Sequence, residues 1–301
     1  MDATMAPRVV VVTRKSELEA LLARHGTRDQ ARFFLTRRGQ ALSGVERGHA
    51  LREEALAAVS RAIPVAWRRT RVDRADLSRF VFEPRDLVVA LGQDGLVANA
   101  AKYLTGQPVL GLNPDPERND GVLVRHRPTA AGPLLAAMAA GRAALEARTL
   151  AEARLDDGQR LLALNEIFAG HRTHQSARYR LAFAGREERQ SSSGVVVATG
   201  TGATGWARSI NGERARRLDL PRPVDPALAF MVREPFPSVA TGTSLDGAVV
   251  PRGQAVVITS EMNDGGVLFG DGIEDDRLDF PFGARAEISA AAETLHLVLG
   301  A

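Results

Sequence analysis

The chain has 301 residues, of which 45% are hydrophobic and 25% are charged, the balance of an ordinary soluble globular protein. This composition excludes collagen-like, mucin-like and wholly disordered chains, and the absence of cysteine excludes disulfide frameworks, thiolate metal sites and cysteine nucleophiles. The net charge is only +3 and aromatic residues make up 5%, without the clustered charge that binding to a duplex requires. We therefore expect phosphate ligands for the arginines and no nucleic-acid partner.

No segment of the sequence has the pattern of a leader or a membrane span. Residues 1–7 lack the charged start and hydrophobic core of a signal peptide. The longest apolar-rich stretch, Ala130–Ala147, is interrupted by glycine, proline and arginine. We therefore expect a cytoplasmic protein that does not cross a membrane.

The first half of the chain alternates between strand and helix patterns. Arg8–Thr13 contains four consecutive valines, which is typical of a strand buried on both faces of a parallel sheet. Ser16 and Glu19 form the capping box of a helix that Gly26 ends. A helix, a strand, a helix and a strand are expected next, over residues 46–62, 86–91, 96–104 and 109–112.

The second half of the chain has short strand patterns separated by turn residues. We expect a helix over 133–154 to lead into it. Seven strands are expected after this helix, at 160–168, 177–183, 194–198, 228–232, 255–259, 266–269 and 286–289. The sequence therefore predicts an α/β domain over 1–128 and a β-rich domain over 129–301.

The tetrapeptide Gly92-Gln93-Asp94-Gly95 follows a buried strand and opens a helix. Glycines at this position allow a close approach to a ligand, and the helix N-terminus favours phosphate. A carboxylate beside phosphate is then explained if Asp94 is the base that takes a proton from an attacking hydroxyl. The alternative is that Asp94 caps the helix.

A second glycine motif, Gly200–Gly205, matches G-x-G-x-x-G after a predicted strand. In a dehydrogenase, an acidic residue about 20 positions later ends the next strand. Here Asp219 precedes two prolines and lies before the next predicted strand. This context argues against a dehydrogenase, and leaves a nucleotide-binding loop or a plain turn.

The third candidate is the pair Asn165–Glu166, which interrupts an apolar run. These side chains either pair with backbone or hold the hydroxyls of a ribose. The histidine pair His171 and His174 and the acidic turn at 271–276 are both expected to be solvated, and we predict no protein metal site.

These three motifs, in this order, resemble the ATP-dependent NAD kinases. That family has a strand followed by G-G-D-G, then an N-E pair, then a strand followed by T-x-T-G-x-T, and this chain has Thr199–Thr204 at the third position. The resemblance runs from Val9 to the end and is weakest between residues 28 and 85. It is closer to the mitochondrial-type branch, through Gly111–Arg118, Ala163–Phe168, Ser192–Gly194 and Arg233–Pro235.

The resemblance implies a Rossmann-like parallel-sheet domain, a β-sandwich-like domain and an active site between them. It also implies that Asp94 is the general base on the 2′-hydroxyl of the NAD adenosine. The residues expected to bind NAD are Asn165, Glu166, Ser193, Thr204, Gly205, Trp206 and Ser209. Those expected to let the backbone approach the ATP phosphates are Gly92, Gly95 and Gly202.

Further expectations concern the phosphates and the partners. Arg14 or Lys15, at the end of the first strand, is assigned here to neutralise phosphate. Magnesium is expected to arrive with ATP and to need few protein ligands. The family implies a homodimer.

Two positions depart from the usual family pattern. Gln93 replaces the second glycine of G-G-D-G, and a backbone φ above zero would strain it by about 1 kcal/mol or more. Many NAD kinases have aspartate where this chain has Ser193, whereas the mitochondrial-type branch has serine.

The sequence predicts an NAD kinase, which converts ATP and NAD to ADP and NADP. Three alternatives stay open: a related kinase acting on a lipid or another nucleoside, a non-catalytic NAD-binding regulatory protein, and the dehydrogenase.

Overall fold

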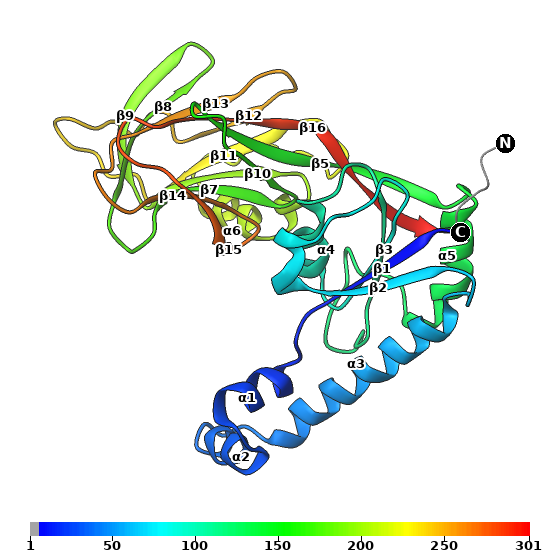
Figure 1. Ribbon diagram of the computed structural model, residues 1–301. Helices are drawn as coiled ribbons and strands as arrows, with labels where there is room; N and C mark the ends of the chain where they lie inside the picture. Colours follow the sequence, from blue (N-terminus) through cyan, green and yellow to red (C-terminus); the bar gives the residue numbers. More distant parts are fainter. Residues whose placement is uncertain (1–5) are drawn as a thin grey trace. The chain divides into compact units, whose positions relative to one another are not determined.

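The computed structural model describes residues 6–301, without the side chain of Asp275. Residues 1–5, on which part of the expectation about a signal peptide rests, lie outside this range. The chain forms two compact units (Figure 1). Unit 1 comprises the chain up to Glu146 together with His296–Ala301, and unit 2 comprises Ala147–Leu295. None of the helices in the described part of the chain has the length and apolar character needed to span a bilayer.

Unit 1 is built on a parallel sheet. Its strand order is β2 (Arg68–Asp73), β1 (Arg8–Thr13), β3 (Leu87–Leu91), β4 (Pro108–Leu112) and the end of β16 (Arg285–Gly300). The valines of β1 are buried on both faces, as the uninterrupted apolar run predicts.

Helices cover the faces of this parallel sheet. The apolar faces of α3 (Leu42–Ala62) and α5 (Ala131–Ala139) form one core with alternate residues of β1, β3 and β4. The helix α4 (Asp94–Ala101) also contacts these three strands. This arrangement confirms the expected α/β fold class.

Local sequence signals explain the other helices of unit 1. Ser16 and Glu19 form the predicted capping box of α1 (Glu17–His25), and Gly26 ends the helix at φ +79°. The sequence analysis did not foresee α2 (Arg28–Thr36), which packs with α1 and α3. Two short 3₁₀ helices, η1 (Arg74–Arg79) and η2 (Pro128–Ala130), complete the unit.

The helix expected over 133–154 is wrong in its second half. The helix α5 ends at Ala139, Gly141 takes φ +65°, and β5 (Ala144–Leu155) follows. Alanine and leucine favour helices, but here the chain gains ladder partners in β6 (Arg160–Ala163) and β16. Tertiary pairing therefore overrides local propensity.

Unit 2 contains two layers of antiparallel strands. One sheet has the order β12 (Gly247–Val250), β11 (Leu228–Arg233), β10 (Gly194–Thr199), β7 (Glu166–His171), β14 (Gly266–Gly270) and β15 (Ile273–Asp279). The other has β16, β13 (Val256–Ser260), β8 (Ala177–Phe183) and β9 (Arg186–Ser192), with β5 beside β16 and β6 beside β5.

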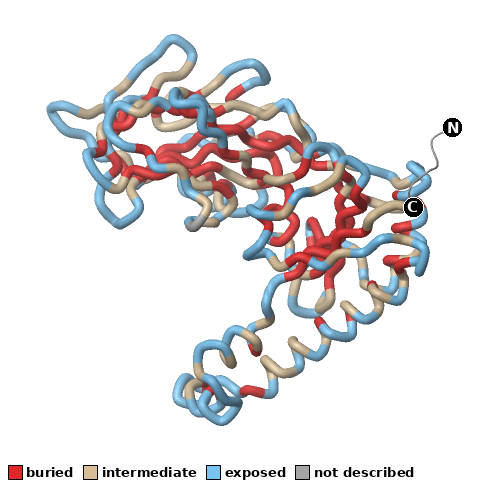
Figure 2. Tube along the Cα trace, viewed as in Figure 1, coloured by how far each residue is buried: buried red, intermediate tan, exposed pale blue. Residues whose placement is uncertain are grey.

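A single apolar cluster fills the space between these layers, including Ile167, Tyr179, Phe230, Ile258 and Phe280. Buried residues follow the strands of both units, as Figure 2 shows. The helix α6 (Trp206–Glu213) and the 3₁₀ turn η3 (Gly202–Thr204) pack beside β10 and β11. The expected β-rich, sandwich-like architecture is confirmed, although the strand expected at 160–168 is broken at Leu164–Asn165.

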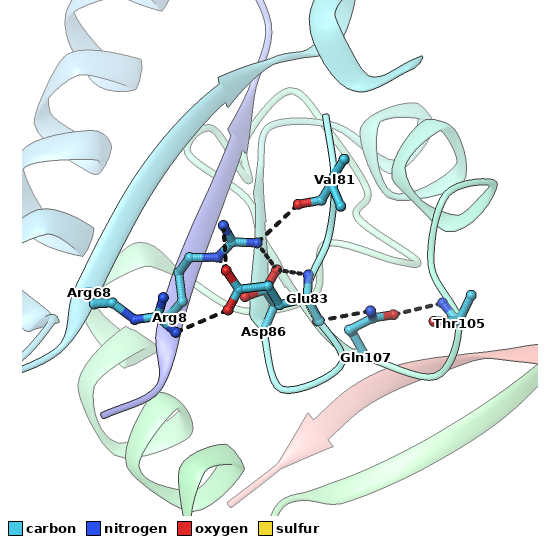
Figure 3. Close-up of polar contacts among 7 residues, drawn as sticks. All are labelled: Arg8, Arg68, Val81, Glu83, Asp86, Thr105 and Gln107. Atoms are coloured by element: carbon cyan, nitrogen blue, oxygen red, sulfur yellow. Dashed lines mark hydrogen bonds and ion pairs between the residues drawn. The ribbon is translucent and has the colours of Figure 1, made fainter. Parts of the chain in front are cut away.

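An ionic network ties the N-terminal ends of the parallel strands in unit 1 together (Figure 3). The Arg8 guanidinium donates to both carboxylate oxygens of the fully buried Asp86, at 2.7 and 2.6 Å, and this contact raises the pKa of Arg8. Asp86 also accepts the N–H of Glu83, whose carbonyl accepts the Gln107 amide. The network therefore stabilises the sheet at the end opposite the Gly92–Gly95 loop.

Candidate functional site

The carboxyl ends of the parallel strands in unit 1 bring several predicted residues together. In open α/β sheets, ligands bind at this edge. Arg14 and Lys15 follow β1, and Gly92 and Gln93 follow β3; all four line a cavity of about 230 Å³. The two predicted phosphate cations therefore lie beside the predicted phosphate loop.

Asp94 is the first residue of α4 and is half-buried. Its Oδ1 accepts the N–H groups of Leu123 (2.8 Å) and Val124 (3.0 Å), and its Oδ2 accepts the N–H of Val122 (2.9 Å). Each carboxylate oxygen has two lone pairs, so Oδ2 can still accept one further donor. Asp94 does not cap its own helix, because Gln93 is the cap residue and makes no side-chain capping bond.

The loop that holds Asp94 is folded tightly after β4. A Cβ on Gly111 would collide with the carbonyl oxygen of Leu123, and Gly121 takes φ +69°. The Asn113 amide donates to the carbonyl of Asn119 at 2.9 Å. This loop was not predicted to be part of the site, although Gly111 at the end of β4 and Gly121 in the loop lie where close approach and a left-handed turn require glycine.

The strain expected at Gln93 is absent. Its φ is −104° and its ψ is 166°, an extended conformation that any residue adopts. Its side-chain amide donates to Oδ1 of Asn119 at 2.9 Å. Gln93 therefore joins the strand β3 loop to the loop after β4, and the glycine-to-glutamine departure is compatible with this backbone.

Neither of the flanking glycines is required by backbone geometry alone. Gly92 and Gly95 have no left-handed φ, and a Cβ on Gly95 would meet no atom within 4 Å. Open space at Gly95 is consistent with a group that approaches the backbone from outside. The predicted role of both glycines at phosphate stays a prediction.

In unit 2, Thr199 connects the Asn165–Glu166 pair to the threonine-glycine loop Thr199–Thr204. Its N–H donates to the carbonyl of Asn165 (2.8 Å) and its hydroxyl donates to that of Leu164 (2.5 Å). The same hydroxyl oxygen accepts the N–H groups of Thr201 (3.0 Å) and Gly202 (3.2 Å). The Asn165–Glu166 pair and the threonine-glycine loop are therefore one structure.

Packing requires the first two glycines of the Gly200–Gly205 motif. A Cβ on Gly200 would collide with the Arg222 carbonyl, and one on Gly202 would collide with the Asn165 carbonyl. The preceding strand, β10, is antiparallel to both of its neighbours, β7 and β11. A dinucleotide fingerprint needs a parallel βαβ unit, so this G-x-G-x-x-G is not one.

Burial, together with the nearby charge of Asp271, raises the pKa of the Glu166 carboxyl to about 7. Asp271 was expected in a solvated acidic turn, which is wrong for this residue. It is half-buried, and its carboxylate accepts the N–H groups of Leu164 and Asn165. The available sequence signal was an aspartate followed by glycine in a turn between strands.

Two of the predicted NAD-binding residues, Ser193 and Trp206, line a cavity of about 510 Å³ in unit 2. Phe168 stacks on Trp206 with ring centres 6.1 Å apart, and the Arg233 guanidinium lies 5.2 Å from the centre of the indole ring. Flat apolar surfaces beside cations suit a planar ring that carries phosphate.

Three further predicted residues, Thr204, Gly205 and Ser209, lie at or just before α6. Ser209 lines a smaller space of about 280 Å³, which Trp206 and Arg233 also line. The Thr204 hydroxyl donates to the Thr201 carbonyl at 2.9 Å, and Gly205 is the residue before α6.

Two histidines border the cavity that Ser193 lines. His171 and His174, expected to be solvated, both line it; His171 is half-buried and His174 is exposed. Among the side chains that the structure describes, no group of three histidine, aspartate or glutamate residues is arranged to hold a metal ion.

Comparison with known proteins gives consistent matches. No family model matches the chain. It is 28% identical to an NAD kinase of Chlorobaculum tepidum over 145 residues, covering 46% of this chain and 48% of that protein. It is 30% identical to an NAD kinase of Psychrobacter arcticus over 154 residues, covering 48% of this chain and 46% of that protein. The matched region thus spans about half the length of these curated relatives.

The fold is also found in solved structures. A yeast NADH kinase in complex with NADH aligns with a TM-score of 0.65 at 16% identity, covering 99% of this chain and 85% of that one. An NAD kinase from Archaeoglobus fulgidus in complex with ATP aligns with a TM-score of 0.58 at 17% identity, covering 98% of this chain and 94% of that one.

Proposed function

We propose that this chain, a member of the NAD kinase family by sequence relationship and fold, transfers the γ-phosphoryl group of ATP to the 2′-hydroxyl of the NAD adenosine. The observation that carries the proposal is the setting of Asp94. Its carboxylate is held at the start of α4 by three backbone N–H groups, with one lone pair of Oδ2 still available. A fixed carboxylate beside a phosphate loop suits a general base.

In the proposed reaction, Oδ2 of Asp94 accepts the proton of the 2′-hydroxyl. The 2′-oxygen forms a bond to the γ-phosphorus, the bond from that phosphorus to the β–γ bridging oxygen breaks, and ADP leaves. Phosphoryl transfer of this kind depends on positioning and charge neutralisation rather than on a covalent intermediate.

The phosphate groups of ATP are assigned to the cavity of Arg14 and Lys15. Both cations line it together with Gly92, and the N-terminus of α4 follows directly. Gly95 and Gly202 are proposed to let the backbone approach phosphate. Mg²⁺ is proposed to enter with ATP, which supplies most of its ligands, and it would neutralise phosphate charge. The carboxylates of Glu17 and Asp115 line the same cavity.

The NAD is assigned to unit 2. Asn165 and Glu166 are proposed to hold the ribose hydroxyls; Glu166 is half-buried, with a carboxyl whose pKa is raised to about 7. Near neutral pH such a carboxyl exists in both forms, so it can accept from or donate to a hydroxyl. The adenosine is assigned to Ser193, Trp206 and Ser209, which line the two cavities of unit 2, and to Thr204 and Gly205, which precede α6.

The remaining parts of the proposal concern setting and assembly. We assign the chain to the mitochondrial-type branch, to a homodimer and to the cytoplasm, and we divide it into a phosphate-binding domain over 1–128 and an NAD-binding domain over 129–301. These assignments rest on the motifs and on the family resemblance.

The deciding experiment is an assay of NADP formation. Purified protein is incubated with ATP, Mg²⁺ and NAD, and NADP is measured with a dehydrogenase specific for it. Parallel reactions contain NADH, or omit ATP. The proposal predicts ATP-dependent NADP, and it fails if the protein binds NAD without phosphorylating it, or transfers hydride to NAD instead.

A further inference from the structure

Asp271 makes three hydrogen bonds to three consecutive residues of the proposed NAD site. Its Oδ1 accepts the N–H of Asn165 at 2.6 Å and its Oδ2 accepts the N–H of Leu164 at 3.0 Å. Its own N–H donates to the carbonyl of Glu166 at 3.1 Å. One residue from the turn between β14 and β15 thus contacts a segment 106 positions earlier.

The segment that Asp271 contacts is a bend between two strands. The strand β6 ends at Ala163 and β7 begins at Glu166, so Leu164 and Asn165 lie outside both strands. Backbone groups that leave a ladder need other partners when they are buried. Here Asp271 satisfies the two N–H groups, and Thr199 satisfies the two carbonyls.

The backbone of Asp271 is also specialised. It takes φ +57°, a left-handed conformation that aspartate, asparagine and glycine adopt more readily than other residues. This conformation directs both the N–H and the carboxylate of one residue to the same bend. Glycine would take the same backbone conformation, but it would leave the N–H groups of Leu164 and Asn165 without the acceptor that the carboxylate supplies.

We propose that Asp271 is a positioning residue for the Asn165–Glu166 pair, fixing the bend so that both side chains are preset to receive the ribose of the dinucleotide. The inference rests on the proposed function of that pair. Because the contacts are with backbone groups, Asp271 acts through its neighbours and not through the substrate.

The substitution Asp271→Asn tests the carboxylate with little change in the turn, since asparagine tolerates the left-handed conformation. It keeps one acceptor oxygen but turns an NH₂ group toward one of the two N–H donors. We expect the KM for NAD to rise about tenfold, the effect of losing one charge-assisted hydrogen bond, while the KM for ATP stays unchanged. A higher KM for NAD with an unchanged KM for ATP would show that the substitution acts at the NAD site.

The matched control is Asp157→Asn. Asp157 also accepts a backbone N–H in a turn, that of Gln159 at 3.0 Å, but in the β5–β6 turn on the surface. Its kinetic constants should equal those of the wild type. A second variant, Asp271→Gly, keeps the turn free of strain and should reproduce the rise in the KM for NAD.

The outcomes separate the two proposals. A wild type that neither binds NAD nor forms NADP contradicts the proposed function itself. If the wild type is active, equal effects of Asp271→Asn on both KM values, or none beyond those of the control, overturn the inference. Hydrogen exchange of the wild type gives a test without variants: the N–H groups of Leu164 and Asn165 should be protected before NAD is added, and fast exchange there also overturns it.

Discussion

At the scale of single residues, Asp94 combines a structural and a proposed catalytic contact in one side chain. Asp94→Asn keeps the size of the group but cannot take up a proton. We expect turnover to fall by about 10²–10⁴-fold, the usual effect of losing a general base. Steady-state assays of NADP formation measure this, and calorimetry should show NAD binding close to that of the wild type.

The same substitution must also disturb the loop after β4. An asparagine NH₂ would face at least one of the N–H groups of Val122, Leu123 and Val124. A melting temperature measured beside the kinetics separates the two effects. Near-native turnover in a folded Asp94→Asn protein would remove Asp94 from the mechanism.

Gln93 has a different expectation now that its backbone is known to be extended. Gln93→Gly relieves no strain, loses the hydrogen bond to Asn119 and adds freedom to the unfolded chain. We expect a loss in the free energy of unfolding of about 1–2 kcal/mol, measured by urea denaturation. A gain in stability would contradict the assigned role of the side chain, and Gln93→Ala should lie between wild type and glycine.

Glu166 gives unit 2 a predictable dependence on pH. Its folded-state pKa of about 7 lies above the ordinary value of 4.5, so the folded state binds the proton more tightly than the unfolded state. The resulting stability is fully present below pH 4.5 and is lost as the pH rises through 7. The change is on the order of 3 kcal/mol at most.

Replacing Glu166 by glutamine should remove this dependence. Urea midpoints measured from pH 4.5 to 8 are expected to fall for the wild type and to fall less for Glu166→Gln. Parallel curves for the two proteins would show that the pKa of Glu166 is close to its ordinary value in the folded protein.

At the scale of elements, the contact between the Thr199–Gly202 turn and the Asn165 bend depends on a missing side chain. Gly202→Ala puts a Cβ into the Asn165 carbonyl and must push the two segments apart. We expect a stability loss of about 1–3 kcal/mol, as for other overpacked sites, together with a higher KM for NAD.

The matched control for this substitution is Gly212→Ala. Gly212 lies in α6 and a Cβ there would meet nothing within 4 Å. Alanine is the better helix former, so stability should rise by up to about 1 kcal/mol. Thermal unfolding of the two variants should therefore shift in opposite directions, and a neutral Gly202→Ala would contradict the described contact.

At the scale of the whole molecule, the last strand returns the chain to unit 1. His296 and Leu297 of β16 pair with Pro108 and Val109 of β4, and Leu297 is fully buried. Leu297→Ala should lower the stability of unit 1 by about 2–5 kcal/mol. Leu299→Ala, at a half-buried position four residues after Leu295, should cost less.

The chain contains two tryptophans, Trp67 in unit 1 and Trp206 in unit 2, so each unit can be followed separately. In a Trp206→Phe background, the fluorescence of Trp67 reports the unfolding of unit 1. Its midpoint in urea should fall in Leu297→Ala. In a Trp67→Phe background, the fluorescence of Trp206 reports the unfolding of unit 2. If Leu297→Ala lowered only the urea midpoint measured there, the assignment of this strand end to unit 1 would be wrong.

Elements whose signal lies within a few residues could be predicted from the amino-acid sequence. The valine run of β1, the capping box of α1 and the apolar strands β3 and β4 follow from burial patterns and caps within a few residues. The strand β2 was not predicted, because Arg68–Asp73 is a charged and mostly exposed strand at the edge of the sheet. Such a strand has few buried residues and therefore no clear apolar pattern. The motifs around Asp94, Asn165 and Thr199 were also visible, although their chemical roles stay predictions.

Contacts between distant segments could not be predicted in this way. The partners of Asp94 lie in a loop 28 to 30 residues away, and those of Asp271 lie 106 and 107 residues away. Likewise, β5 is a strand because β6 and β16 pair with it, although its composition favours a helix. Local propensities amount to less than about 1 kcal/mol per residue, so ladder bonds and burial supplied by distant segments override them, and no window of sequence contains those segments together.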